Sequence, residues 1–312
     1  YVQRFFEPIR TLTMHYAALQ RAVASGHRIF ELLDIPLDIA DKPEAKPIGD
    51  VDGRVEFKNV TFGYNPERPI LRNISFVAEP GQTIALVGPT GSGKTSITAL
   101  AHRFYDVQEG SISIDGQDIR DVTQESIGHV MGMVLQEPFL FSKSVLENVS
   151  YNTENATRED VVAACQIIGA HDFVMQLDNG YDTTLEQRGS NLSVGQRQLL
   201  SFARALVADP KILVLDEATA NIDSYTERII QEALKKLLEG RTALVIAHRL
   251  STIRNSNQII VVRDGEIVEK GTHDELLAET GLYAQLWQTN YTSFDDIAGN
   301  ADSITGAPIS ST

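Results

Sequence analysis

Several residue types are scarce in this sequence, and each scarcity argues against a class of protein. Cys165 is the single cysteine, so no internal disulfide can form and nothing requires an oxidising compartment; the cytoplasmic side is expected. The 27 Lys and Arg residues are outnumbered by 42 Asp and Glu, and the net charge of -15 disfavours nonspecific binding of nucleic acid. The seven histidines lack ligand spacing, so no zinc-type site is expected.

Long apolar runs are missing as well. No stretch reaches the roughly 18 to 20 apolar residues of a membrane span, and the N-terminus lacks the pattern of a signal peptide. The chain as given is therefore expected to be soluble. It begins at Tyr1 without a methionine, which suggests a piece of something longer.

The first thirty residues carry an apolar stripe at spacings of three and four, which predicts a helix that packs on other helices. Four arginines against one acid in this segment suit the cytosolic end of a membrane-spanning helix, and an amphipathic helix of a soluble domain is the alternative. The stripe consists of Phe5, Ile9, Leu12, Tyr16, Leu19 and Val23.

Three regions are expected along the chain. Residues 34–50 contain three prolines and mixed charges, so residues 1–50 are interpreted as the helix plus a linker. The main domain is predicted at 51–291. Residues 292–312 are too poor in apolar side chains to pack and are predicted to be a flexible tail.

The main domain alternates strand and helix patterns. Alternating residues predict antiparallel strands at 55–62 and 74–79, and short apolar runs predict buried strands at 84–88, 211–216 and 242–248. Helical patterns occur at 93–105, 158–169, 195–207 and 223–238. The expected fold is an α/β layered fold with a parallel sheet.

A glycine-rich loop, G-P-T-G-S-G-K-T at residues 88–95, follows one buried strand and opens a helix. Gly88, Gly91 and Gly93 let backbone N–H groups turn toward phosphates, Lys94 adds a positive charge, and Thr95 offers its hydroxyl to Mg²⁺. The alternative is a glycine turn that binds nothing.

A phosphate-binding loop also needs a metal ligand and a base. The strand ending in Asp216 and Glu217 provides a candidate for each: Asp216 holds Mg²⁺ through water, and Glu217 acts as general base. His248 ends a neighbouring apolar strand and is a candidate donor to the γ-phosphate, or else a core histidine. Gln136 is a candidate contact to both Mg²⁺ and the attacking water.

The stretch N-L-S-V-G-Q-R-Q at 191–198 begins a further helix, and helix starts leave backbone N–H groups that attract anions. Nothing within a few residues of Ser193 supplies a phosphate. The anion must come from elsewhere in the chain or from another chain.

Together these motifs, in this order from about residue 50 to 291, resemble the nucleotide-binding domain of an ATP-binding cassette (ABC) exporter of the bacterial multidrug or lipid type. The resemblance implies a P-loop ATPase with a parallel-sheet core, an antiparallel β subdomain and a helical subdomain carrying the signature N-L-S-V-G-Q. It also implies that residues 1–50 are the cytosolic end of the last transmembrane helix and its linker. The implied ATP-binding residues are Tyr64, which stacks on adenine, and Gly88, Pro89, Thr90, Gly91, Ser92, Gly93, Lys94, Thr95 and Ser96.

The resemblance further implies a head-to-tail pair of such domains, identical or homologous. Each ATP then lies between one P-loop and the partner's Ser193, Gly195 and Gln196, with Asp223 in the D-loop. ATP hydrolysis with Mg²⁺, held by Thr95, Gln136 and Asp216, would power export of a drug, lipid or peptide. The partners would be a second nucleotide-binding domain and a transmembrane domain of the same polypeptide, at the cytoplasmic face of the membrane.

Three departures from the family pattern stand out. Val194 replaces the usual signature glycine, Gln187 stands where exporters commonly carry Glu, and the D-loop reads A-N-I-D instead of Ser-Ala-Leu-Asp. Val194 is expected to be tolerated, whereas a Cβ on Gly195 is expected to press on the phosphate or the opposing loop. The rival functions are an ABC ATPase acting on DNA or ribosomes, and a regulatory half that binds ATP without hydrolysing it.

Overall fold

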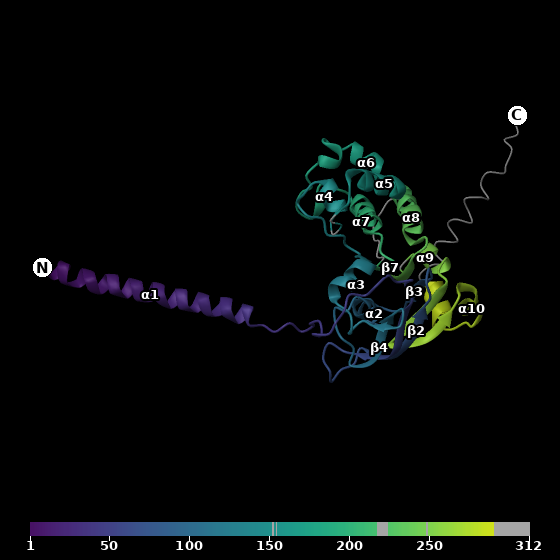
Figure 1. Ribbon diagram of the computed structural model, residues 1–312, viewed down its shortest axis with the longest axis horizontal. Coiled ribbons are helices and arrows are strands. Elements are labelled where there is room, and N and C mark those ends of the chain that lie inside the picture. The colour runs from purple at the N-terminus through teal and green to yellow at the C-terminus, as the bar shows by residue number, and fades with distance from the viewer. Residues whose placement is uncertain (152, 154, 217–223, 248, 290–312) are drawn as a thin grey trace, which may run out of the picture. The chain divides into compact units, whose positions relative to one another are not determined.

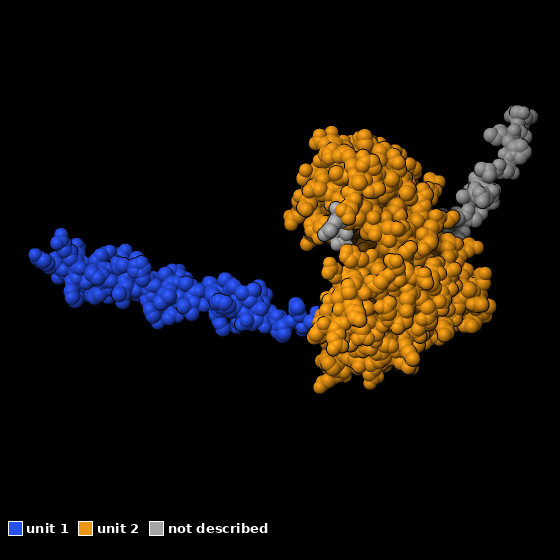
Figure 2. All heavy atoms as spheres, viewed as in Figure 1, with its two compact units in different colours: residues 1–40 blue, residues 41–312 orange. Residues whose placement is uncertain are grey.

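The structure is a computed structural model that describes residues 1–151, 153, 155–216, 224–247 and 249–289. Contacts divide the chain into two units, residues 1–40 and 41–312 (Figure 2). Within the described ranges, no helix combines the length and apolar character that crossing a bilayer requires. The predicted tail beyond 291 lies outside the described residues.

The first unit is built on α1 (Val2–Leu33), a 32-residue helix. None of its residues is buried, and every member of the predicted apolar stripe is exposed. The helix predicted from the three-and-four spacing is confirmed, and its apolar stripe has no cover within the unit to which it belongs.

The second unit starts with a segment that the proline pattern had placed in the linker. Asp41 accepts hydrogen bonds from Arg103 Nη1 at 3.2 Å and from the backbone N–H of Gln124 at 3.0 Å. Lys46 forms an isolated parallel bridge with Val122. Residues 41–50 therefore contact the main domain, whereas the sequence expectation set the boundary near residue 50.

Two sheets form the centre of this unit. The antiparallel sheet has the order β2 (Leu71–Ala78), β1 (Val55–Phe62), β4 (Glu109–Ile114) and β5 (Gln117–Asp118). The larger sheet has the order β10 (Glu266–Gly271), β9 (Gln258–Arg263), β3 (Thr83–Val87), β8 (Thr242–Ile246), β7 (Ile212–Asp216) and β6 (Met131–Val134). Its strands run parallel except β10, which is antiparallel to β9.

The larger sheet is covered on both faces, and successive side chains of each strand point alternately to one face and to the other. Ile84 and Leu86 of β3 join a core with β1, β2 and α2, whereas Ala85 and Val87 join a second core built largely from helices. This double burial explains why β3, β7 and β8 read as continuous apolar runs instead of alternating ones.

The helices confirm the predicted periodic segments (Figure 1). Helices α4 to α8 gather at one end of the unit, away from β2 and β4. Among the described residues of this unit, the labelled helices are α2 (Lys94–Ala101), α3 (Gln124–Val130), α4 (Val145–Val149), α5 (Arg158–Ile168), α6 (His171–Met175), α7 (Val194–Ala208), α8 (Ser224–Leu238), α9 (Leu250–Arg254) and α10 (His273–Ala278), with 3₁₀ turns at Gly180–Asp182 and Gln187–Gly189. Residues 282–289 are helical as well.

One helix is shorter than its pattern suggested. The apolar spacing extends to residue 105, but α2 ends at Ala101 because His102 leaves the helical conformation and Arg103 takes a φ of 54°. The chain then turns toward β1 instead of continuing along the helix axis.

Candidate functional site

The glycine-rich loop, Asp216 and Gln136 lie at the carboxyl ends of four neighbouring parallel strands. Asp216 closes β7 and pairs in register with Ile246 at the end of β8, which lies beside β3. The glycine-rich loop follows β3, and Gln136 follows β6 on the other side of β7. This edge is where open parallel sheets bind their ligands. Glu217, Asp223 and His248 lie outside the described residues.

The glycine-rich loop has a backbone that only glycine fits at its first position. Gly88 has a φ of 153°, and a Cβ there would lie 2.1 Å from the carbonyl oxygen of Val262. Gly93 is left-handed, with a φ of 107°, and caps α2. The strand, loop and helix order predicted from the sequence is confirmed.

Lys94 folds its side chain into this loop. Its Nζ donates to the carbonyl oxygens of Gly88 and Pro89 at 2.8 and 2.9 Å and lies 3.4 Å from Ser92 Oγ. Burial lowers the pKa of Lys94, and the nearby charge of Asp216 partly raises it again. A buried ammonium held by neutral carbonyls is a strong binder of an anion, because phosphate oxygens would restore its lost solvation.

Side chains with oxygen atoms that can bind a metal lie at the same carboxyl edge of the sheet. Thr95 in the first turn of α2 and Gln136 after β6 are exposed, and Asp216 is half-buried. A hydroxyl, an amide and a carboxylate are hard ligands of the kind Mg²⁺ prefers, and Mg²⁺ usually completes its shell with water and phosphate oxygens. Among the described residues no group of three His, Cys, Asp or Glu could hold a metal ion.

Tyr64, the predicted adenine contact, comes two residues after β1. Its side chain is 55% exposed. Its hydroxyl lies 3.3 Å from Ser96 Oγ in α2, so the ring is held beside the phosphate loop. An exposed aromatic ring next to a phosphate site suits a stacked base.

The signature segment caps α7. Ser193 Oγ accepts from the backbone N–H of Gln196 at 3.2 Å, and Gln196 Oε1 accepts from the N–H of Ser193 at 2.9 Å. The N–H groups of Val194 and Gly195, in the first turn, are those that a helix start leaves for an external acceptor. Val194 is 47% exposed.

Gly195 lies close to another helix, a contact that the sequence did not reveal. A Cβ at this position would lie 2.3 Å from Cγ2 of Thr226 and 3.4 Å from Cδ1 of Ile230, both on α8. Within this chain, the first obstacle to a side chain is thus the neighbouring helix, and the pressure on a phosphate or an opposing loop stays a prediction.

Gln187 lies in the 3₁₀ turn before α7 and is exposed. The carboxylate next to it, Glu186, accepts from Ser190 Oγ at 2.7 Å. The Glu186 carboxylate is therefore hydrogen-bonded within its own loop, and the exposed side chain at position 187 is a neutral amide.

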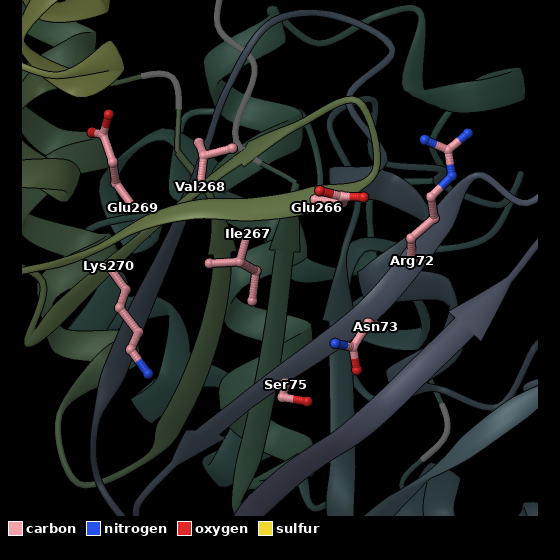
Figure 3. A pocket seen from close by; sticks show the side chains of 8 residues that line it. All are labelled: Arg72, Asn73, Ser75, Glu266, Ile267, Val268, Glu269 and Lys270. Atoms are coloured by element: carbon pink, nitrogen blue, oxygen red, sulfur yellow. The ribbon is translucent and has the colours of Figure 1, made fainter.

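A separate hollow lies between the edge strands of the two sheets. Figure 3 shows it lined by Arg72, Asn73 and Ser75 of β2 and by residues 266–270 of β10. None of the predicted site residues lines it, so it is not the phosphate site.

Sequence reasoning missed one aromatic residue of this region, Tyr105. Its ring centroid lies 5.0 Å from that of Tyr64. The pair Phe104–Tyr105 is visible in the sequence after the glycine-rich loop. The helical pattern at 93–105 included both residues in the helix, so their position after its end was missed.

Comparisons with known proteins agree with this geometry. The family model described as ABC transporter matches residues 71–220. An uncharacterised ABC transporter ATP-binding protein of Bacillus subtilis (strain 168) is 48% identical over 293 residues, which are 94% of this chain and 48% of that protein. An ATP-dependent lipid A-core flippase of Syntrophus aciditrophicus (strain SB) is 43% identical over 286 residues, 92% of this chain and 47% of that protein.

Two further likenesses extend the comparison. A fatty acid ABC transporter ATP-binding/permease protein of Mycobacterium bovis is 45% identical over 287 residues, 92% of this chain and 45% of that protein. The solved structure of a bacterial Atm1-family ABC exporter with ATP bound matches with a TM-score of 0.82 at 40% identity, over 94% of this chain and 51% of that one.

The chain therefore belongs to the ABC transporter family, and its fold is that of the ABC ATPase domain. The predicted parallel core, antiparallel β subdomain and helical part are confirmed. The chain spans about half the length of the curated relatives that it matches.

Proposed function

We propose that this chain binds ATP with Mg²⁺ at the carboxyl edge of its parallel sheet and hydrolyses it. The observation that carries the proposal is that the phosphate loop, Asp216 and Gln136 follow or close β3, β7 and β6, at the same edge of one parallel sheet. Family membership supports the same reading.

Each group has a defined task in this proposal. Lys94 exchanges its contacts to Gly88 and Pro89 for the β- and γ-phosphates, and the backbone N–H groups between Gly88 and Ser96, which Pro89 lacks, donate to the same oxygens. Thr95, Asp216 and Gln136 would hold Mg²⁺, which supplies positive charge to the phosphate oxygens when bound. Tyr64 stacks on adenine.

Glu217 is proposed as the general base that accepts the proton of the attacking water, and His248 as a donor to the γ-phosphate. Both follow strand ends of the same edge, directly after Asp216 and Ala247. Because both residue types are present, hydrolysis is favoured over a regulatory half that only binds ATP.

The complete site is proposed to need a second domain. The first turn of α7 offers the hydroxyl of Ser193 and the N–H groups of Val194 and Gly195, with Gln196 fixing the cap. In a head-to-tail pair these groups would meet the γ-phosphate held by the partner's loop, and Asp223 would lie in the D-loop between the two sites. The partner is an identical or homologous domain.

The whole protein is proposed to be an exporter at the cytoplasmic face of a membrane. The apolar stripe of α1, exposed along its whole length, suits the end of a transmembrane helix that packs on others. Relatives are named for fatty acid and lipid A-core transport, which favours an amphipathic cargo over nucleic acid or ribosomes as the target. Drugs and peptides remain candidate cargoes.

Two variants test the ATPase. Lys94→Ala should lose ATP binding, because the loop loses its only side-chain cation. Glu217→Gln should keep ATP binding but lose most turnover, since an amide cannot accept a proton, and should elute as a dimer in size exclusion only when ATP is present. Parental turnover in either variant would contradict the proposed site, and loss of binding in Glu217→Gln would remove that residue from the role of base.

A further inference from the structure

Three aromatic rings pack together at the predicted adenine position. The centroid of Tyr64 lies 5.0 Å from that of Tyr105, with the planes at 75°, and 5.1 Å from that of Phe62, with the planes at 83°. Phe62 and Tyr105 also touch, at 5.5 Å. Tyr64 is thus supported by two edge-on neighbours, a favoured arrangement of aromatic pairs.

Tyr105 lies on a segment that is fixed just before it. Arg103 is 2% exposed, has a φ of 54°, and donates from Nη1 to the carbonyl oxygen of Val122 at 2.8 Å. Its Nε donates to Asp106 Oδ1 at 3.2 Å. A buried guanidinium with these partners holds the turn after α2 in one conformation.

The same segment is also fixed just after Tyr105, by hydrogen bonds to residues next to Tyr64. Gln108 Nε2 donates to the carbonyl oxygen of Gly63 at 2.8 Å, and the backbone N–H of Gln108 donates to the carbonyl oxygen of Thr61 at 3.1 Å. Tyr105 therefore lies in a segment that hydrogen bonds hold on both sides, whereas Tyr64 lies in an exposed loop.

An exposed tyrosine without support would have to lose side-chain rotation each time a base stacked on it. We propose that Tyr105 is a positioning residue for nucleotide binding, which holds the ring of Tyr64 in the orientation that a purine base stacks on. The inference rests on the proposed function, since it requires that Tyr64 be the adenine contact.

The experiment measures binding of two ligands to the 312-residue chain by calorimetry with Mg²⁺ present. ATP carries the base, and inorganic triphosphate does not. The variants are Tyr105→Ala, Tyr105→Phe, Tyr64→Ala and the Tyr64→Ala/Tyr105→Ala double variant. Phe104→Ala is the matched control, because Phe104 is an exposed aromatic neighbour whose ring stacks on His102 instead.

Tyr105→Ala should weaken ATP binding about three- to tenfold, the range of one lost aromatic pair, and leave triphosphate binding unchanged. Tyr105→Phe and Phe104→Ala should bind ATP like the parent. In the Tyr64→Ala background, Tyr105→Ala should have no further effect, because its contact is already gone.

Three results would overturn the inference: parental ATP binding in Tyr105→Ala, an equal loss of triphosphate binding, or an undiminished effect of Tyr105→Ala in the Tyr64→Ala background. Failure of the proposed function has a different outcome. If Tyr64→Ala binds ATP like the parent, adenine lies elsewhere, and the proposed roles of both Tyr64 and Tyr105 are wrong. If Tyr64→Ala binds ATP more weakly but Tyr105→Ala binds it like the parent, only the role of Tyr105 is wrong.

Discussion

Gly195 packs against α8 so closely that its replacement should act first on stability. An alanine Cβ would lie 2.3 Å from Cγ2 of Thr226, whereas carbon atoms in contact are about 3.5 to 4.0 Å apart. Its other neighbour, Cδ1 of Ile230, is 3.4 Å away and can be accommodated. The conflict therefore concerns one methyl group.

Overpacking of this kind costs about 1 to 3 kcal/mol, and the lower half of the range is expected because the obstacle is a side chain. About 1 kcal/mol lowers the midpoint of thermal unfolding by roughly 2 to 4 °C in domains of this size. Gly195→Ala should thus unfold a few degrees below the parent.

The decisive variant is Gly195→Ala/Thr226→Ser. Serine lacks Cγ2 but keeps the hydroxyl, so the double variant should recover most of the lost stability, and Thr226→Ser alone is the control. Thermal unfolding followed by circular dichroism measures the cycle, and steady-state ATPase activity is measured alongside. A double variant as unstable as the sum of its parts would refute this reasoning, and normal stability with lost ATPase in Gly195→Ala would place the conflict at the nucleotide instead.

Two further predictions concern other residues. Val194→Gly should leave ATPase activity within a few-fold of the parent, because backbone N–H groups of α7 do not depend on this exposed side chain; an increase by orders of magnitude would mean that Val194 weakens the signature. His102 should make unfolding pH-dependent: burial lowers its pKa from 6.5 to about 4, so the folded protein keeps it neutral and loses stability as the pH falls from about 6.5 to 4. The free energy of unfolding of His102→Gln, measured in urea, should fall less than that of the parent over this window, and parallel curves would contradict the shift.

The sequence predicted those parts of the fold that rest on local patterns. Continuous apolar runs identified β3, β7 and β8 because both faces of the larger sheet are buried, and the loop from Gly88 to Thr95 was recognisable because glycine is required by its backbone. The signature helix α7 was predicted from the helical pattern at 195–207, whereas its capping box of Ser193 and Gln196 was found only in the structure.

The missed features depend on contacts between distant segments. No residue near Asp41 in the sequence indicates that Arg103 donates a hydrogen bond to it, so residues 41–50 were predicted to be part of the linker. The approach of Thr226 to Gly195 and of Tyr105 to Tyr64 arises only when the helices and strands pack together. Spacing along the chain could not reveal either contact.

The proposed function requires that each ATP is shared between the phosphate loop of one chain and the signature of another. Two variants that are inactive alone test it directly: Glu217→Gln, which lacks the base, and Ser193→Arg, which blocks the first turn of α7. A mixed pair contains one complete site, built from the base of one chain and the signature of the other.

The measurement is the steady-state ATPase rate of an equal mixture of these two variants. Roughly a quarter of the parental rate should return, since half of randomly formed pairs are mixed and each mixed pair has one complete site of two. A mixture that stays as inactive as either variant alone would contradict the shared site.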